Sequence, residues 1–252
     1  MKSLLTLIGI TALVIGLSAA EFDTKAFAEN YKNGSYDAII SAFEGGKAQI
    51  LKAKPYPRLA AAFYYVAAKA KKGGVYKNSS EALSEFYKLF AEFGATGDAT
   101  QQIVTLHQIF GEDAKAVEIA RKSTHKGAQF RGCVSLSRLK KYEEAADWAA
   151  TIELGHAQRS AITWARLAKA PAKVLTYGLK AVNSGAFTAP ADVKKLVEYV
   201  LATNFEGSTV TDVQIKTFLQ TVNRRCSRFL KPGNPTAWDE VIQLVRQTLE
   251  TY

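Results

Sequence analysis

The chain has 252 residues, of which 48% are hydrophobic, and it carries a formal net charge of +10. This length allows one large domain or two small ones, and the hydrophobic content excludes wholesale disorder. The positive charge favours anionic partners, although a solvated basic surface has the same composition. Two cysteines are too few for a disulfide-dense scaffold.

The first twenty residues have the pattern of a secretory signal peptide. Lys2 supplies a positive start, residues 4–17 form an apolar run, and small residues at 18–20 precede the first acidic residue, Glu21. The run is shorter than the roughly 20 residues of a spanning helix, so an uncleaved anchor is the alternative. We predict cleavage after Ala20 and a single all-α domain over residues 21–252. No later segment is apolar enough to span a bilayer.

Apolar residues then recur at helical spacing along the rest of the chain, with glycine and proline between the periodic segments. The glycines at 45–46 are expected to end one helix, and Pro55 and Pro57 to end the next. The expected helices cover residues 21–31, 36–43, 47–53, 58–72, 79–93, 98–110, 113–123, 130–139, 142–154, 157–170, 171–183, a segment from 190, 210–229 and 238–249.

These segments amount to about thirteen or fourteen helices with short links and essentially no β-sheet. Helix starts near Glu81, Asp113, Glu144 and Val174 are 32, 31 and 30 residues apart. Two helices per interval is the spacing of a helical-hairpin solenoid. An irregular all-α bundle is the alternative, because this spacing also arises without repeats.

Two phrases, NGSYDAI at residues 33–39 and KKYEEAA at residues 140–146, resemble the turn and second-helix start of tetratricopeptide-like repeats. The chain lacks the tryptophan-leucine-glycine start of that pattern, and its prolines are not regularly placed. The resemblance implies a superhelical stack with a concave surface for protein partners.

No motif indicates catalysis, a metal or a cofactor. The three histidines, His107, His125 and His156, have no metal-ligand spacing. His107 is expected in the core, and the other two near helix C-termini. There is no phosphate-binding glycine loop and no nucleophile elbow. The acids at 143, 144 and 147 are expected on a solvated helix face.

Cys133 and Cys226 both lie on apolar stripes. In an oxidising compartment they could form a disulfide that closes a long loop and stabilises by about 4–5 kcal/mol. Two buried free thiols are the alternative.

Basic residues cluster near predicted helix ends, where the helix dipole alone favours them. If the hairpins stack in register, these ends could share one edge as a positive strip formed by Lys71, Lys72, Arg121, Lys122, Lys140, Lys141, Arg224 and Arg225.

The sequence favours an exported, secreted or periplasmic, non-enzymatic scaffold that binds a protein or peptide in a helical groove. One alternative is a basic binding module for an anionic envelope polymer or membrane surface. Another is an enzyme with a dispersed site. Nucleic acid is not the expected partner.

Overall fold

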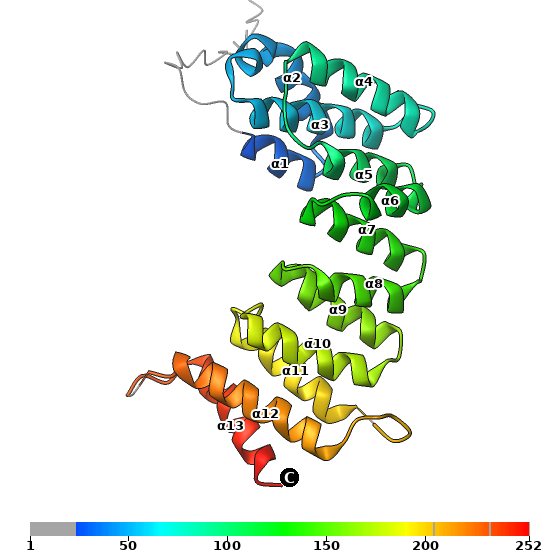
Figure 1. Ribbon diagram of the computed structural model, residues 1–252. Helices are drawn as coiled ribbons and strands as arrows, with labels where there is room; N and C mark the ends of the chain where they lie inside the picture. Colours follow the sequence, from blue (N-terminus) through cyan, green and yellow to red (C-terminus); the bar gives the residue numbers. More distant parts are fainter. Residues whose placement is uncertain (1–23, 204, 232, 252) are drawn as a thin grey trace, which may run out of the picture.

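The computed structural model describes residues 24–203, 205–231 and 233–251, which form an all-α stack (Figure 1). No strand occurs in these ranges, and the predicted signal peptide lies outside them. The described residues form thirteen α-helices and one short 3-10 helix: α1 (Lys25–Lys32), α2 (Tyr36–Lys52), α3 (Pro55–Lys72), α4 (Ser79–Glu92), α5 (Thr100–Ile109), α6 (Asp113–Arg121), α7 (Lys126–Arg138), α8 (Tyr142–Thr151), α9 (Gly155–Leu167), α10 (Pro171–Ser184), α11 (Pro190–Ala202), α12 (Asp212–Cys226), η1 (Ser227–Phe229) and α13 (Ala237–Leu249).

Consecutive helices run in opposite directions, so the connections alternate between two long edges of the stack (Figure 1). Consecutive helices from α1 to α11 pack against each other, and α12 packs on α10 and α13. We call the edge that carries the connections before α3, α5, α7, α9, α11 and α13 the left edge. The edge that carries the connections before α4, α6, α8, α10 and α12 is the right edge. Helices two apart also touch, as α3 does with α5 and α5 with α7. The predicted solenoid of helical hairpins is confirmed at this level.

One turn recurs along the right edge. Gly111, Lys140 and Lys169 all have left-handed backbones, with φ of 73°, 60° and 56°, and they lie 29 residues apart (111 to 140 to 169). Each turn closes with the same two backbone hydrogen bonds, which satisfy carbonyls that the ending helix leaves free; at Lys140 they are Lys140 N to Ser137 O and Lys141 N to Leu136 O. Gly34 makes the same turn before α2.

The residue five positions after each of these turns is wholly buried. These residues are Ile39, Ala116, Ala145 and Val174, all at 0% exposure. A shared turn followed by a shared core position defines the repeating unit from the structure. The units with this turn therefore begin with α2, α6, α8 and α10. Glu81, which the sequence spacing suggested as a unit start, lies in the first turn of α4, which has the same alternation but follows a different loop.

Two predicted helix boundaries near the N-terminus are wrong. The Gly45–Gly46 pair does not end a helix, because α2 continues to bury Ile50 beside Phe43. Burying such a side chain contributes about 1.5–3 kcal/mol, against about 1 kcal/mol for each helical glycine. Pro55 begins α3 instead of preceding it, because the first helical residues need no backbone N–H donor.

The apolar core is divided into two main clusters, which meet near the middle of the stack. One cluster of buried residues joins α1 to α5, and a larger one joins α7 to α13. Between them lies a small cluster of Val104, Ala116 and Ala120 against Trp148. Buried polar residues fill much of the remaining space at this junction.

Candidate binding site

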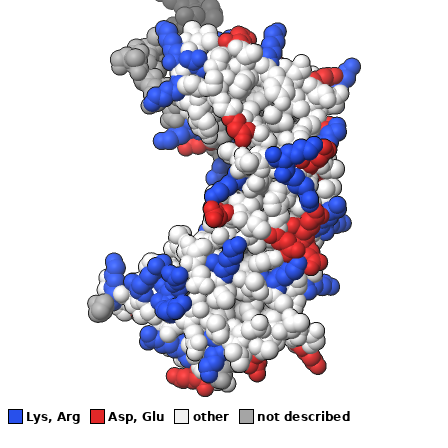
Figure 2. All heavy atoms as spheres, viewed as in Figure 1, with Lys and Arg blue, Asp and Glu red and all other residues white. Residues whose placement is uncertain are grey.

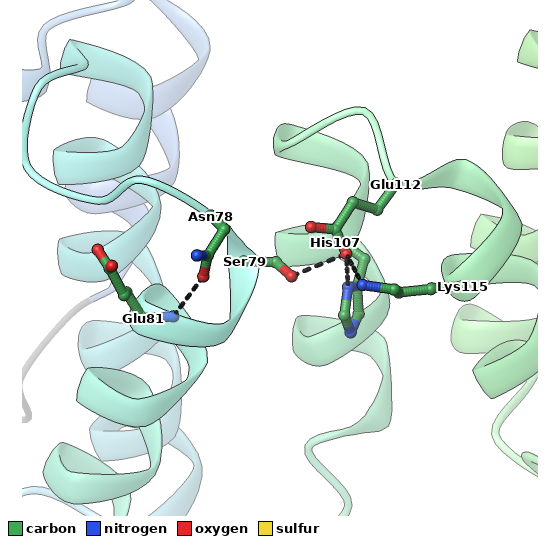
Figure 3. A network of polar contacts seen from close by, with 6 residues as sticks. All are labelled: Asn78, Ser79, Glu81, His107, Glu112 and Lys115. Atoms are coloured by element: carbon green, nitrogen blue, oxygen red, sulfur yellow. Dashed lines mark hydrogen bonds and ion pairs between the residues drawn. The ribbon is translucent and has the colours of Figure 1, made fainter.

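The first polar network at this junction lies on the right edge and centres on Glu112, the residue before α6 (Figure 3). Its Oε2 accepts from Ser79 Oγ at 2.9 Å and from Lys115 Nζ at 2.9 Å, and it lies 3.0 Å from His107 Nδ1. Lys115, with help from Ser79 and His107, lowers the pKa of Glu112 to about 2 against the opposing effect of burial.

Ser79, His107 and Glu112 are residue types found in nucleophilic catalysis, but their geometry differs from a catalytic relay. Serine and histidine each bond to the carboxylate, whereas a nucleophile needs its base in contact with the hydroxyl. Ser79 is also fully buried, so no substrate reaches it. This network joins α4, α5 and α6 structurally, and His107 is the satisfied core histidine that the sequence indicated.

A second polar network joins α5, α6 and α7. Gln108 Nε2 donates to Ser135 Oγ at 2.9 Å, and Ser135 Oγ donates to Asp113 Oδ1 at 2.7 Å. Arg138 Nη1 lies 3.6 Å from the same Asp113 oxygen. These side chains bond to one another within the stack, so we assign them to helix packing and not to ligand binding.

The predicted basic strip does not lie along one edge. Four of its residues lie on the right edge, near the ends of α3 and α7: Lys71, Lys72, Lys140 and Lys141. The other four lie on the left edge, at the ends of α6 and α12: Arg121, Lys122, Arg224 and Arg225. The reason is topological, because the C-termini of successive antiparallel helices fall on opposite edges. Two are also neutralised across helices: Lys72 pairs with Asp37 at 2.5 Å, and Arg121 pairs with Glu144.

Cys133 and Cys226 are both buried and free. They lie on α7 and α12, two helices well separated in the series (Figure 1). Burial raises the pKa of the Cys133 thiol to about 12 and that of Cys226 to about 11. The structure thus holds the two free thiols and not the disulfide.

The other two histidines lie at helix N-termini, not near C-termini as expected. His125 caps α7, where its Nδ1 accepts from Ala128 N at 3.2 Å. His156 is in the first turn of α9, and its ring meets Phe130 edge-on at 4.5 Å. In the described part of the chain no three His, Cys, Asp or Glu side chains are grouped as metal ligands.

The candidate site is a hollow on the left edge, about midway along the stack (Figure 2). The odd-numbered helices begin at this edge, so their N-termini lie along it. None of α1, α3, α5, α7 and α9 carries an acidic residue in its first turn. The even-numbered helices α2, α4, α6 and α8, which begin on the right edge, each carry at least one acidic residue in the first turn. The positive ends of the dipoles of α1 to α9 on the left edge are therefore not neutralised by acids of their own first turns, whereas those of α11 and α13 are.

A pocket of about 270 Å³ lies on the upper flank of this hollow, between α1, α3, α5 and α7. Its aromatic wall comes from one face of α3, where Tyr56, Ala60, Phe63 and Tyr64 follow helical spacing. Tyr56 is 69% exposed, so this wall is open to solvent. The opposite wall is polar and is formed by Gln101, Gln102, Thr105, Asp98, His125 and Arg131.

Within the described residues, one polar group of this pocket lacks a hydrogen-bond partner and another lacks an ion-pair partner. The Gln102 side-chain oxygen is buried without a hydrogen-bond partner there, a state that costs about 1–3 kcal/mol. The Arg131 guanidinium makes no ion pair in the same ranges, and its charge acts on Tyr31 and Tyr64. Burial nevertheless raises the pKa of Tyr31 to about 12, so the tyrosine is a neutral neighbour of this cation. A ligand that donates to Gln102 and brings negative charge to Arg131 would satisfy both.

A second pocket of about 220 Å³ lies between α9 and α11, and Arg159, Phe187 and Asp192 line its end nearest the left edge. Arg166 lies over the Tyr199 ring at 3.8 Å there, and Arg159 donates to the backbone oxygen of Ala186. Phe130, which stacks on Trp164 at 6.1 Å, joins α7 to α9 between the two pockets. On the left edge, a cation and an aromatic ring thus occur at both pockets, Arg131 with Tyr56 at the first and Arg159 with Phe187 at the second. The Arg166–Tyr199 pair lies near the right-edge ends of α9 and α11.

Sequence reasoning missed this site. The face of α3 that carries Tyr56, Phe63 and Tyr64 repeats at i, i+7 and i+8, which could have indicated a second apolar face beside the buried one. Nothing in the spacing of Gln102 or Arg131 would have placed them opposite that face, because they come from other repeats.

Comparison of the chain with protein-family models, with curated proteins and with solved structures gives no match. Within the described residues, no helix combines the length and apolar content needed to cross a bilayer. The chemistry of the pocket and of the hollow is therefore the guide to what the chain binds.

Proposed function

We propose that this chain is an exported, non-enzymatic scaffold that binds a segment of a partner protein in the hollow of the left edge. The observation that carries the proposal is the upper pocket, where an exposed aromatic wall faces the uncommitted Gln102 oxygen and the Arg131 guanidinium. A polypeptide supplies what both walls lack: backbone N–H donors, carboxylate groups and apolar side chains.

The size of the pocket suits one or two amino-acid side chains. Its volume is about 270 Å³, near the lower end of the roughly 300–1,000 Å³ of pockets for drug-sized ligands. One or two side chains would fill it, and the rest of the segment would follow the hollow toward Phe130 and the second pocket.

Export and a tetratricopeptide-like architecture are parts of the same proposal. Residues 1–20 support export by their composition. The recurring turns at Gly111, Lys140 and Lys169 support a repeat architecture, although their 29-residue interval is shorter than the roughly 34 residues of tetratricopeptide repeats.

The experiment is selection of peptides from a random displayed library on residues 21–252, followed by affinity measurements on variants. Tyr56→Ala removes an exposed ring from the aromatic wall, so folding should be unaffected and affinity should fall about tenfold or more, as for an anchor residue. Arg131→Gln should weaken peptides that contain acidic residues more than neutral ones.

The matched control is Tyr87→Ala on α4. Tyr87 is 50% exposed, and it does not line the pocket. Its removal should leave affinity unchanged within about twofold, since surface contacts outside an anchor contribute little. Selected peptides that bind the Tyr56→Ala and Tyr87→Ala variants equally well, or no enrichment of any peptide, would contradict the proposal.

A further inference from the structure

The end of α12 and the residues that follow it form a strongly basic stretch of the chain. No acidic residue occurs between Asp212 and Asp239. Four cations fall within eight residues near the end of this stretch: Arg224, Arg225, Arg228 and Lys231. We call these four residues the basic cap. They lie at one end of the stack, where Figure 2 shows Lys and Arg gathered at the lower left.

The charges of the basic cap are not compensated by the protein. None of the four makes an ion pair within the described ranges, whereas many cations elsewhere do, such as Lys69 with Glu85 and Lys126 with Glu153. The nearest acids along the chain are engaged: Asp239 accepts from Thr236 N at 2.6 Å, and Glu240 pairs with Lys194 at 3.1 Å. α10, which packs on α12, carries no acid.

The helix dipole does not account for the basic cap. A helix C-terminus presents about half a negative charge, and its effect fades within the last turn. Four positive charges exceed this several-fold, and Arg228 and Lys231 lie beyond the end of α12. Surplus charge of this size indicates an anionic partner.

An apolar group lies within the basic cap. Phe229 is 36% exposed. Its ring stacks on that of Trp238, with 4.6 Å between the ring centroids. The guanidinium carbon of Arg228 lies 4.7 Å from the centroid of the Phe229 ring. With both neighbours over the ring, its face is not free to stack on a nucleic-acid base, which is how aromatic residues bind single strands. Its exposed edge remains available to an apolar phase.

We propose that the basic cap and Phe229 bind the surface of an anionic phospholipid bilayer. Lipid phosphates would neutralise the cations, and the edge of Phe229 would enter the interface beside them, as aromatic residues do at membrane boundaries. This contact uses one end of the stack and leaves the hollow of the left edge open, so it would add membrane attachment to a scaffold that binds elsewhere.

The test is co-sedimentation of residues 21–252 with vesicles that contain phosphatidylglycerol and with vesicles of phosphatidylcholine alone. We expect binding to the first and little to the second, with affinity falling as salt rises. The triple variant Arg224→Gln, Arg228→Gln, Lys231→Gln should bind about a hundredfold more weakly, at about fivefold for each cation removed near the surface. Arg225 is left intact because its Nε is buried.

The control variant removes the same charge on the right edge: Lys71→Gln, Lys140→Gln, Lys141→Gln. These lysines are exposed. If the basic cap is the contact surface, this variant should keep most of the wild-type affinity for the vesicles. An equal loss in both triple variants would overturn the proposal, because it would show a general charge effect.

Phe229→Ser separates a bilayer from a soluble anionic polymer. It should weaken vesicle binding and leave the salt dependence unchanged. Binding to soluble polyphosphate as tight as to vesicles, together with no effect of Phe229→Ser, would overturn the membrane proposal in favour of a polymer. Loss of peptide binding in the Tyr56→Ala variant with vesicle binding retained would show that the two sites are independent.

Discussion

Gly132 in α7 is a position where the two neighbouring helices, α6 and α8, leave no room for a side chain. A Cβ atom placed there would lie 2.6 Å from Ala120 Cβ on α6 and 2.6 Å from a ring carbon of Trp148 on α8. Gly46 in α2 is also helical, but a Cβ placed there meets nothing within 4 Å. The same substitution, glycine to alanine, should therefore have opposite effects at these two positions.

The magnitudes follow from two opposing terms. Alanine is favoured over glycine in a helix interior by about 1 kcal/mol, so Gly46→Ala should be more stable by about that amount. Gly132→Ala gains the same propensity, but its methyl overpacks a buried contact, which costs about 1–3 kcal/mol. Since it is blocked on two sides, we expect a net loss of about 1–2 kcal/mol.

The assay is thermal unfolding followed by circular dichroism. For a chain of this size, 1 kcal/mol shifts the midpoint by about 2–4 °C, so Gly46→Ala should unfold a few degrees higher and Gly132→Ala a few degrees lower. Adding Trp148→Phe to Gly132→Ala removes the ring atoms that clash. The two changes should therefore be less destabilising together than the sum of each alone. A Gly132→Ala variant that is as stable as Gly46→Ala would refute the close helix approach at this position.

Three further results are expected. Lys140→Gly should stabilise by about 1 kcal/mol in urea unfolding, because Lys140 holds a φ of 60° that glycine adopts without strain; a destabilised variant would contradict the turn geometry. The folded-state pKa of Glu112 is lowered from 4.5 to about 2, so its contribution, up to about 3 kcal/mol, is present above pH 4.5 and is lost as the pH falls toward 2. Glu112→Gln should therefore flatten this part of the stability–pH curve, and an unchanged curve would argue against the network around Lys115. Cys133 and Cys226 should resist a thiol reagent in the native protein and should both react after unfolding without reductant, whereas no reaction after unfolding would indicate a disulfide.

Local sequence features determined the helices of this protein. Apolar residues at helical spacing located nearly every helix, because an amphipathic helix must place its apolar residues on one face to bury them. The errors arose where a local rule competed with burial or with position in the helix. At Gly45–Gly46 the burial of Ile50 prevailed. A helix does end before Pro55, as expected, but the next one begins at Pro55 and not at Arg58, because the first helical position tolerates the proline ring.

The repeat could be recognised from sequence only approximately, because one turn is encoded by different residues. Gly111, Lys140 and Lys169 adopt the same left-handed backbone conformation. Of the three, only glycine is a residue type from which that conformation can be predicted. The core position that follows each turn likewise accepts alanine, valine or isoleucine, since the space between helices differs from unit to unit.

Sequence by itself determined that the chain is basic and all-α, and it favoured a stack of helical hairpins over an irregular bundle. Only the tertiary structure decided which side chains meet. The antiparallel direction of successive helices divided the expected basic strip between two edges, and it brought Tyr56, Gln102 and Arg131 from three separate helices around one pocket. These contacts join residues far apart in the chain, so their geometry depends on how the repeats stack and not on any local pattern.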